Sequence, residues 1–205
     1  MTTSTRDYSK PVDRPTLERV ADALQSHGMD ARIVPSGDVV GLVDALVPDE
    51  AMVYTATSQT LDNLGVADRV REATRFRTTR AHTETLDPAT QMSEFRRHIS
   101  TMDVVIGSVH AITEDGVVVA ASYSGSQLAP YVFGADRVIW VVGAQKIVPD
   151  LDTAFDRIEQ HSLPLESERL QKLYGIPSAV AKEIVIRQEQ PGRIHVVLLE
   201  DAIGF

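Results

Sequence analysis

Apolar residues recur along the chain with two spacings, one typical of helices and one of buried strands. Leu17, Val20, Ala21 and Leu24 lie three or four positions apart, which predicts a helix over 15–27 that stops at Gly28. Similar patterns predict further helices over 38–46, 61–64, 67–73, 89–100, 124–133 and 150–160. Residues 1–14 are polar, so we expect a flexible tail before a single domain over 15–205.

Short apolar runs alternate with these helices. They predict strands over 31–34, 51–55, 101–108 and 137–142. This alternation predicts an α/β fold with a mostly parallel sheet and helices on both faces. Two more strands, over 183–187 and 193–199, are joined across Pro191-Gly192, and we expect them to add an antiparallel pair at the C-terminus.

The overall charge limits the classes of partner. With 29 acidic and 20 basic residues, the formal net charge is −9, so the chain lacks the positive field that attracts nucleic acid. Five arginines over 69–80 are a local exception, and the pattern favours a solvated helix face over an anion site. No run approaches the roughly 20 apolar residues that span a bilayer, so we expect no membrane contact and a cytoplasmic location.

The chain contains no cysteine, which excludes disulfides, thiolate nucleophiles and Cys-ligated zinc or iron–sulfur centres in it. Six histidines are scattered, and no two have the helical spacing of a zinc site. We therefore expect neither a metal nor a cofactor. His98 is expected on the surface of a helix, whereas His82, in an irregular stretch, could approach a site.

The first candidate site residues follow the predicted strand over 51–55. Thr57, Ser58 and Thr60 form a small polar turn before a helix. Ligands of open α/β sheets bind outside the carboxyl ends of strands, where helix N–H groups and hydroxyls favour anions. The alternative is that Thr57 or Ser58 only caps the helix, and the sequence leaves both interpretations open.

A second candidate is the acidic turn that contains Glu114 and Gly116, between apolar runs over 111–113 and 117–122. If it is desolvated, Glu114 could act as a catalytic base or nucleophile. Glu-Asp-Gly is also good hairpin-turn chemistry on a solvent-exposed surface, and the pattern alone favours that interpretation.

Three more residues complete the set of ligand-binding candidates. Ser124 and Gly125 belong to another polar turn between a strand and a helix. Lys146 follows the most apolar predicted strand, so it could meet an anion at the carboxyl end of the sheet. A surface lysine before a proline-containing loop would give the same pattern.

Several of these segments resemble motifs of the LUD (lactate utilisation) domain family. Residues 108–116 resemble its Ser-x-x-Ala-x-Thr-Glu-x-Gly motif, and residues 133–148 are similar to its second long motif. Residues 57–61 look like its Ser-x-Thr-Leu turn, and residues 191–205 resemble its characteristic ending. The resemblance spans about 17–205.

The resemblance implies a fold like that of ribose phosphate isomerases and coenzyme A transferases. It also implies an accessory subunit in the oxidation of L-lactate to pyruvate, with iron–sulfur or flavin redox subunits as partners. Two alternatives are an enzyme or binding protein for a phosphorylated or coenzyme A-thioester ligand, and a non-catalytic regulatory module. The sequence contains no complete catalytic motif that would decide among them.

The chain departs from the family pattern at two places. Relatives often carry a Cys-rich segment where residues 173–186 contain no cysteine. Relatives also tend to have Asn-Arg where this chain has Ser126-Gln127, and Asn where it has Gln145. An iron–sulfur role within this chain and an anion contact by the missing arginine are therefore not expected.

Overall fold

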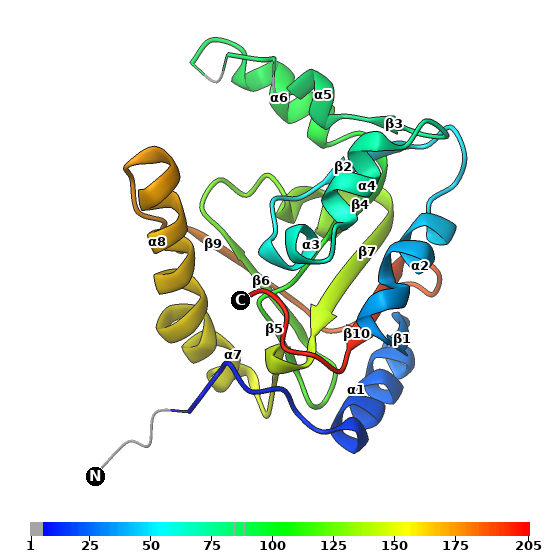
Figure 1. Ribbon diagram of the computed structural model, residues 1–205, viewed down its shortest axis with the longest axis vertical. Coiled ribbons are helices and arrows are strands. Elements are labelled where there is room, and N and C mark those ends of the chain that lie inside the picture. The colour runs from blue at the N-terminus through cyan, green and yellow to red at the C-terminus, as the bar shows by residue number, and fades with distance from the viewer. Residues whose placement is uncertain (1–5, 84, 88) are drawn as a thin grey trace.

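Parallel strands form the main sheet of the molecule, in the order β1-β10-β7-β4-β2-β3 (Figure 1). Each neighbouring pair is parallel. The computed structural model describes residues 6–83, 85–87 and 89–205. The strands are β1 (Asp30–Val34), β2 (Met52–Thr55), β3 (Arg77–Thr78), β4 (Met102–Gly107), β7 (Ala135–Gly143) and β10 (Ile194–Leu199).

Helices cover both faces of this sheet, because its central strands are apolar on both sides. In β7, Trp140 packs with the helix α1 (Arg14–Ser26), whereas the neighbouring Ile139 packs with residues of α2 (Val39–Leu46) on the other face. The latter face also carries α3 (Gln59–Asn63) and α4 (Val66–Glu72). The expected α/β fold is confirmed.

A second, mixed sheet lies on the α1 side of the main sheet, in the order β8-β5-β6-β9. Its strands are β5 (Ala111–Thr113), β6 (Val118–Ser122), β8 (Ile147–Val148) and β9 (Lys182–Ile186). Ile112 belongs to the central core, whereas the adjacent Ala111 packs with Ala154 of α7 (Leu151–Arg157). The small sheet is therefore covered on both faces too.

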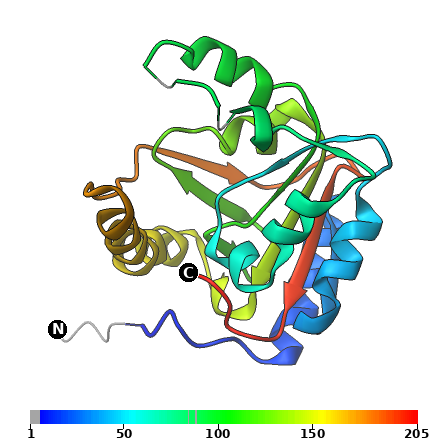
Figure 2. The same ribbon diagram turned by 45° about the horizontal axis from the view of Figure 1, so that its top comes forward.

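Two helical segments lie at different sides of the fold. A π-helical turn (Ile158–Ser162) joins α7 to α8 (Leu163–Tyr174). The helices α5 (Arg80–Thr83) and α6 (Met92–Ile99) occupy the connection from β3 to β4. Figures 1 and 2 both place α5 and α6 away from α7 and α8. None of the helices in the described ranges is both long and apolar enough to cross a membrane.

The C-terminal strands exist, but they do not pair with each other as expected. The strand β9 is antiparallel to β6 in the small sheet, whereas β10 lies between β1 and β7 in the main sheet. Almost every residue of β10 is buried, which suits a central parallel strand rather than a hairpin. The tail expected over 1–14 lies partly outside the described residues, and in its described part Tyr8 is buried against the small sheet.

Candidate functional site

The carboxyl ends of parallel strands converge on a cleft of about 530 Å³. Chain segments that follow four strands of the main sheet line it: Thr57 and Ser58 after β2, Ser108 and His110 after β4, Lys146 after β7, and Phe205 after β10. Arg169, Leu170 and Tyr174 of α8 contribute another wall. The cleft is therefore at the edge of the sheet where α/β proteins bind ligands.

Lys146 forms the floor of the cleft and is only 2% exposed. Its Nζ donates hydrogen bonds to Thr60 Oγ1 and Ser108 Oγ, both at 3.0 Å. No acidic side chain among the described residues forms an ion pair with it. Burial and the positive charge of Arg157 lower the pKa of Lys146 well below its ordinary value. The ammonium has three N–H donors, so one remains for a ligand.

A second cation, Arg157 of α7, lies directly behind this floor and is fully buried. Its Nη1 donates to the carbonyl oxygen of His110 at 2.6 Å and to Ser162 Oγ at 2.9 Å. Its Nη2 finds no hydrogen-bond partner in the described part of the chain. Burial lowers the pKa of Arg157 to about 10, so the guanidinium stays charged at neutral pH. The floor of the cleft thus holds the amino group of Lys146, with the charged guanidinium of Arg157 behind it, and a bound anion would favour the protonated form of the lysine.

His110 supplies a neutral donor on the cleft wall. Its Nδ1 accepts a hydrogen bond from the backbone N–H of Ala121 at 3.1 Å, so the neutral ring carries its proton on Nε2. Loss of hydration, together with the charges of Lys146 and Arg157, lowers the pKa of His110 to about 3. The imidazole is therefore uncharged at neutral pH.

The structure brings several residues predicted from the sequence together at this cleft. Thr57, Ser58, Ser124 and Lys146 line it, and Thr60 is buried against the lysine ammonium. Ser58 occupies the N-cap position of α3, yet its side chain forms no capping hydrogen bond. Its hydroxyl is therefore not used to cap the helix, and Ser58 lines the cleft instead.

Gly125 acts through the backbone. Its φ of 85° turns the chain between Ser124 and Ser126, which both line the cleft and whose hydroxyls lie 3.0 Å apart. A residue with a Cβ is strained in this left-handed conformation, so glycine suits the turn.

Glu114 and Gly116, which the sequence offered as candidate site residues, do not line this cleft. Glu114 pairs with Arg19 of α1 at 3.5 Å, and Gly116 packs against α1 at Ala23. The strands β5 and β8 run side by side away from the cleft. Glu114 follows β5, which puts it about 10 Å along this ladder from the cleft floor. The hairpin turn itself forms as predicted, between antiparallel β5 and β6.

Sequence reasoning missed Arg157 and His110 as site residues. Arg157 falls between Ala154 and Ile158 on the buried face of its helix, and a charged residue on an apolar face was the available signal. Of the arginines over 69–80, Arg69 and Arg75 both pair with Asp44 away from the floor. Arg71 lines the cleft rim but pairs with Asp68 at 2.5 Å.

Comparison with known proteins identifies the family. The fold is similar to that of a DUF162 family protein from Deinococcus radiodurans (TM-score 0.56, 13% identity), covering 92% of this chain and 99% of that one. Ribose 5-phosphate isomerase A from Neisseria gonorrhoeae gives a TM-score of 0.34 at 10% identity, covering 80% of this chain and 69% of that one. Ribose 5-phosphate isomerase from Plasmodium falciparum gives a TM-score of 0.33 at 14% identity, and the match covers 68% of this chain and 65% of that one. No curated protein matches this chain. The LUD domain family model matches residues 17–199, and the chain therefore belongs to the LUD domain family.

Proposed function

We propose that the cleft binds an organic anion and that Lys146 is its main recognition group. One observation carries this proposal: the Lys146 ammonium is buried with two hydroxyl partners and, within the described chain, no carboxylate. Burying a charge without a counter-charge costs several kcal/mol. A bound carboxylate or phosphate would supply the missing negative charge, and Arg157 would strengthen its binding from behind the floor.

The size and lining of the cleft favour a ligand larger than a three-carbon acid. Its volume of about 530 Å³ lies within the range usual for small-molecule sites. Hydroxyl groups around the floor, including those of Thr57, Ser58 and Ser124, suit an oxygen-rich ligand. A phosphorylated or coenzyme A-thioester metabolite, with its charged group at Lys146, would meet both requirements.

Family membership supports a role in lactate utilisation. In this proposal the chain is an accessory subunit in the oxidation of L-lactate to pyruvate. The electrons would pass through iron–sulfur or flavin groups of partner subunits, because this chain has no cysteine to ligate a cluster. Deletion of the gene should impair growth on L-lactate, and a pull-down should recover a redox partner. Normal growth together with no redox partner would contradict this role.

Anion binding is tested with the purified chain and a panel of defined ligands. The panel contains L-lactate, pyruvate, inorganic phosphate, ribose 5-phosphate and coenzyme A, and the readouts are thermal shift and calorimetry. We expect a phosphorylated ligand to raise Tm, and Lys146→Met to abolish the response. Lys172→Met, on the exposed side of α8, is the matched control and should respond like the wild type. A panel with no effect on the wild type, or an equal effect on Lys146→Met, would contradict the proposal.

A further inference from the structure

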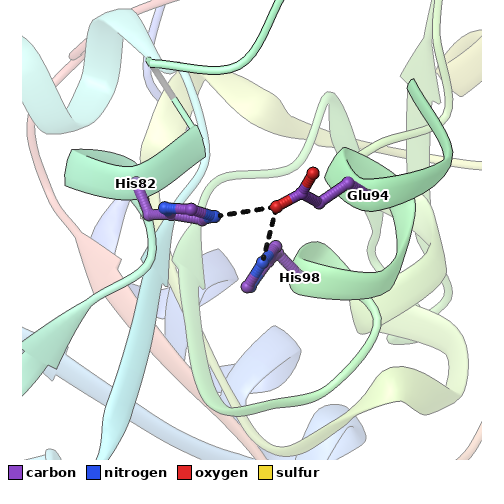
Figure 3. A group of neighbouring side chains, drawn as sticks. All are labelled: His82, Glu94 and His98. Carbon is purple, nitrogen blue, oxygen red and sulfur yellow. Dashed lines mark ion pairs between the residues drawn. The ribbon is translucent and has the colours of Figure 1, made fainter. Parts of the chain in front are cut away.

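A second group of chemically capable side chains lies at α5 and α6, away from the cleft. His82 comes from α5, and Glu94 and His98 come from α6 (Figure 3). Glu94 and His98 are four positions apart, which places them on one face of the helix. His82 reaches the same point from the segment that follows β3, and its ring centroid lies 4.3 Å from that of His98.

The three side chains present their ligand atoms to one point. The Glu94 Oε1 atom is 3.4 Å from Nε2 of His82 and 3.9 Å from Nε2 of His98. One ligand atom from each residue lies within 4.8 Å of the others. Zinc bonds of about 2.0–2.2 Å place tetrahedral ligands about 3.4 Å apart. The two distances from Glu94 Oε1 are thus within about half an ångström of the spacing between ligand atoms in a tetrahedral zinc site.

Small side-chain rotations would complete the geometry. All three side chains are a little under half exposed, so neighbouring atoms leave their outer parts room to rotate. A surface ion pair needs one histidine and one carboxylate, and it contributes little to stability. A metal ion, by contrast, requires all three ligand atoms to surround one point, and the atoms of His82, Glu94 and His98 are grouped in this way.

We propose that His82, Glu94 and His98 bind a divalent transition metal ion, with Zn²⁺ the best match. Two imidazole nitrogens and one carboxylate oxygen suit zinc, whereas Mg²⁺ and Ca²⁺ require mainly oxygen ligands. Three protein ligands leave a fourth position open to solvent, for water or for a side chain of another molecule. The bound ion ties α5 to α6 and so fixes the connection between β3 and β4. This site is independent of the anion cleft.

The test is a zinc titration of the full chain, freed of any purification tag and treated with a chelator. Calorimetry should give one Zn²⁺ per chain, and excess Mg²⁺ should not compete. His82→Ala, Glu94→Gln and His98→Ala should each weaken binding by at least about 10- to 100-fold, because each removes a direct ligand. His27→Ala removes a histidine outside the cluster, and Arg97→Ala alters an exposed position of α6. Both controls should bind like the wild type.

A second measurement keeps the test independent of how the variants fold. Co²⁺ replaces Zn²⁺ in such sites, and a low-coordinate site with nitrogen ligands gives intense visible absorption. The wild-type chain should show this spectrum at one equivalent of Co²⁺, and one equivalent of Zn²⁺ should abolish it. The weak spectrum of hydrated Co²⁺, or zinc affinity that is unchanged in all three ligand variants, would overturn the proposal. Loss of binding in His27→Ala equal to that in His98→Ala would also overturn it.

Discussion

Replacing Lys146 with methionine should stabilise the ligand-free protein while abolishing its response to anions. The substitution keeps a long unbranched side chain but removes a buried amino group whose charged form is disfavoured by burial and by Arg157. The two hydroxyls that lose the ammonium retain other partners: Thr60 Oγ1 donates to the carbonyl of Ile203, and Ser108 Oγ donates to that of Val141. Neither hydroxyl is therefore left without a hydrogen bond, which is the usual reason that such substitutions destabilise.

The expected change in the free energy of unfolding follows from the fact that no described acidic side chain pairs with Lys146. Replacing buried charged groups with well-packed apolar ones is often stabilising by roughly 1–4 kcal/mol. Lys146 is 2% exposed, so solvent screens its charge little. We expect an increase of about 1–3 kcal/mol in the free energy of unfolding of Lys146→Met, and each kcal/mol raises Tm by roughly 2–4 °C in a chain of this size.

Urea unfolding and thermal shift, each with and without the anion, provide the assay. At a ligand concentration of about 100 times Kd, the wild type should gain about 2.7 kcal/mol, and Lys146→Met should gain nothing measurable. Destabilisation of the ligand-free variant by several kcal/mol would contradict this expectation, because it would mean that the Lys146 amino group has a stabilising partner. Retention of the full anion response would refute the assignment of Lys146 as the recognition group.

Four further substitutions test other parts of the structure. The pKa of His110 is lowered in the folded state, so stability is full above its ordinary pKa near 6.5 and is lost as pH falls toward 3. Between pH 6.5 and 4.5, urea unfolding of His110→Asn should therefore show a shallower decline than the wild type, by up to about 1.4 kcal/mol per pH unit. A Cβ at Gly107 would overlap the buried hydroxyl of Tyr131, so Gly107→Ala should lower stability by about 1–3 kcal/mol or more. Gly41→Ala, in α2, where a Cβ meets nothing, should raise stability by up to about 1 kcal/mol, and equal effects in the two glycine variants would exclude overlap as the cause. Glu114→Gln alters an exposed ion pair, so its anion affinity should equal that of the wild type, and lost binding would show that the acidic turn reaches the cleft.

Features set by local pattern could be predicted from the sequence, whereas strand partners could not. The apolar period of α1 depends only on neighbouring positions, and its buried residues are the predicted Leu17, Val20, Ala21 and Leu24. The pairing of β10 depends on contacts with β1 and β7, which are distant in the chain. A proline-glycine turn suggested a hairpin there, and the tertiary preference of a doubly buried strand outweighed it.

Among the cleft residues, too, some could be predicted from local sequence and others depend on contacts between distant segments. The rule that ligands bind at the carboxyl ends of parallel strands was sufficient to select Ser58 and Lys146. It does not apply to Glu114, because a turn motif does not reveal which end of the small sheet it occupies; the solvent-exposed hairpin that the pattern favoured is what the structure shows. The cluster around His98 was missed for a related reason: helical spacing was applied to pairs of histidines, whereas the partners are a glutamate on the same helix and a histidine from α5.

Lys146 and the charged Arg157 also give a physical reason why a chain with a net charge of −9 would attract the proposed anion. Charges on the surface are screened beyond about 8 Å at physiological ionic strength, so the excess of acidic residues acts weakly at the cleft floor. At the rim the charges are largely compensated, as in the Arg169–Glu166 pair at 2.7 Å. Lys146 and Arg157 lie in surroundings where screening is small and no acidic side chain of the described residues pairs with them. The local field that an entering anion meets is therefore positive, although the field of the whole protein is negative.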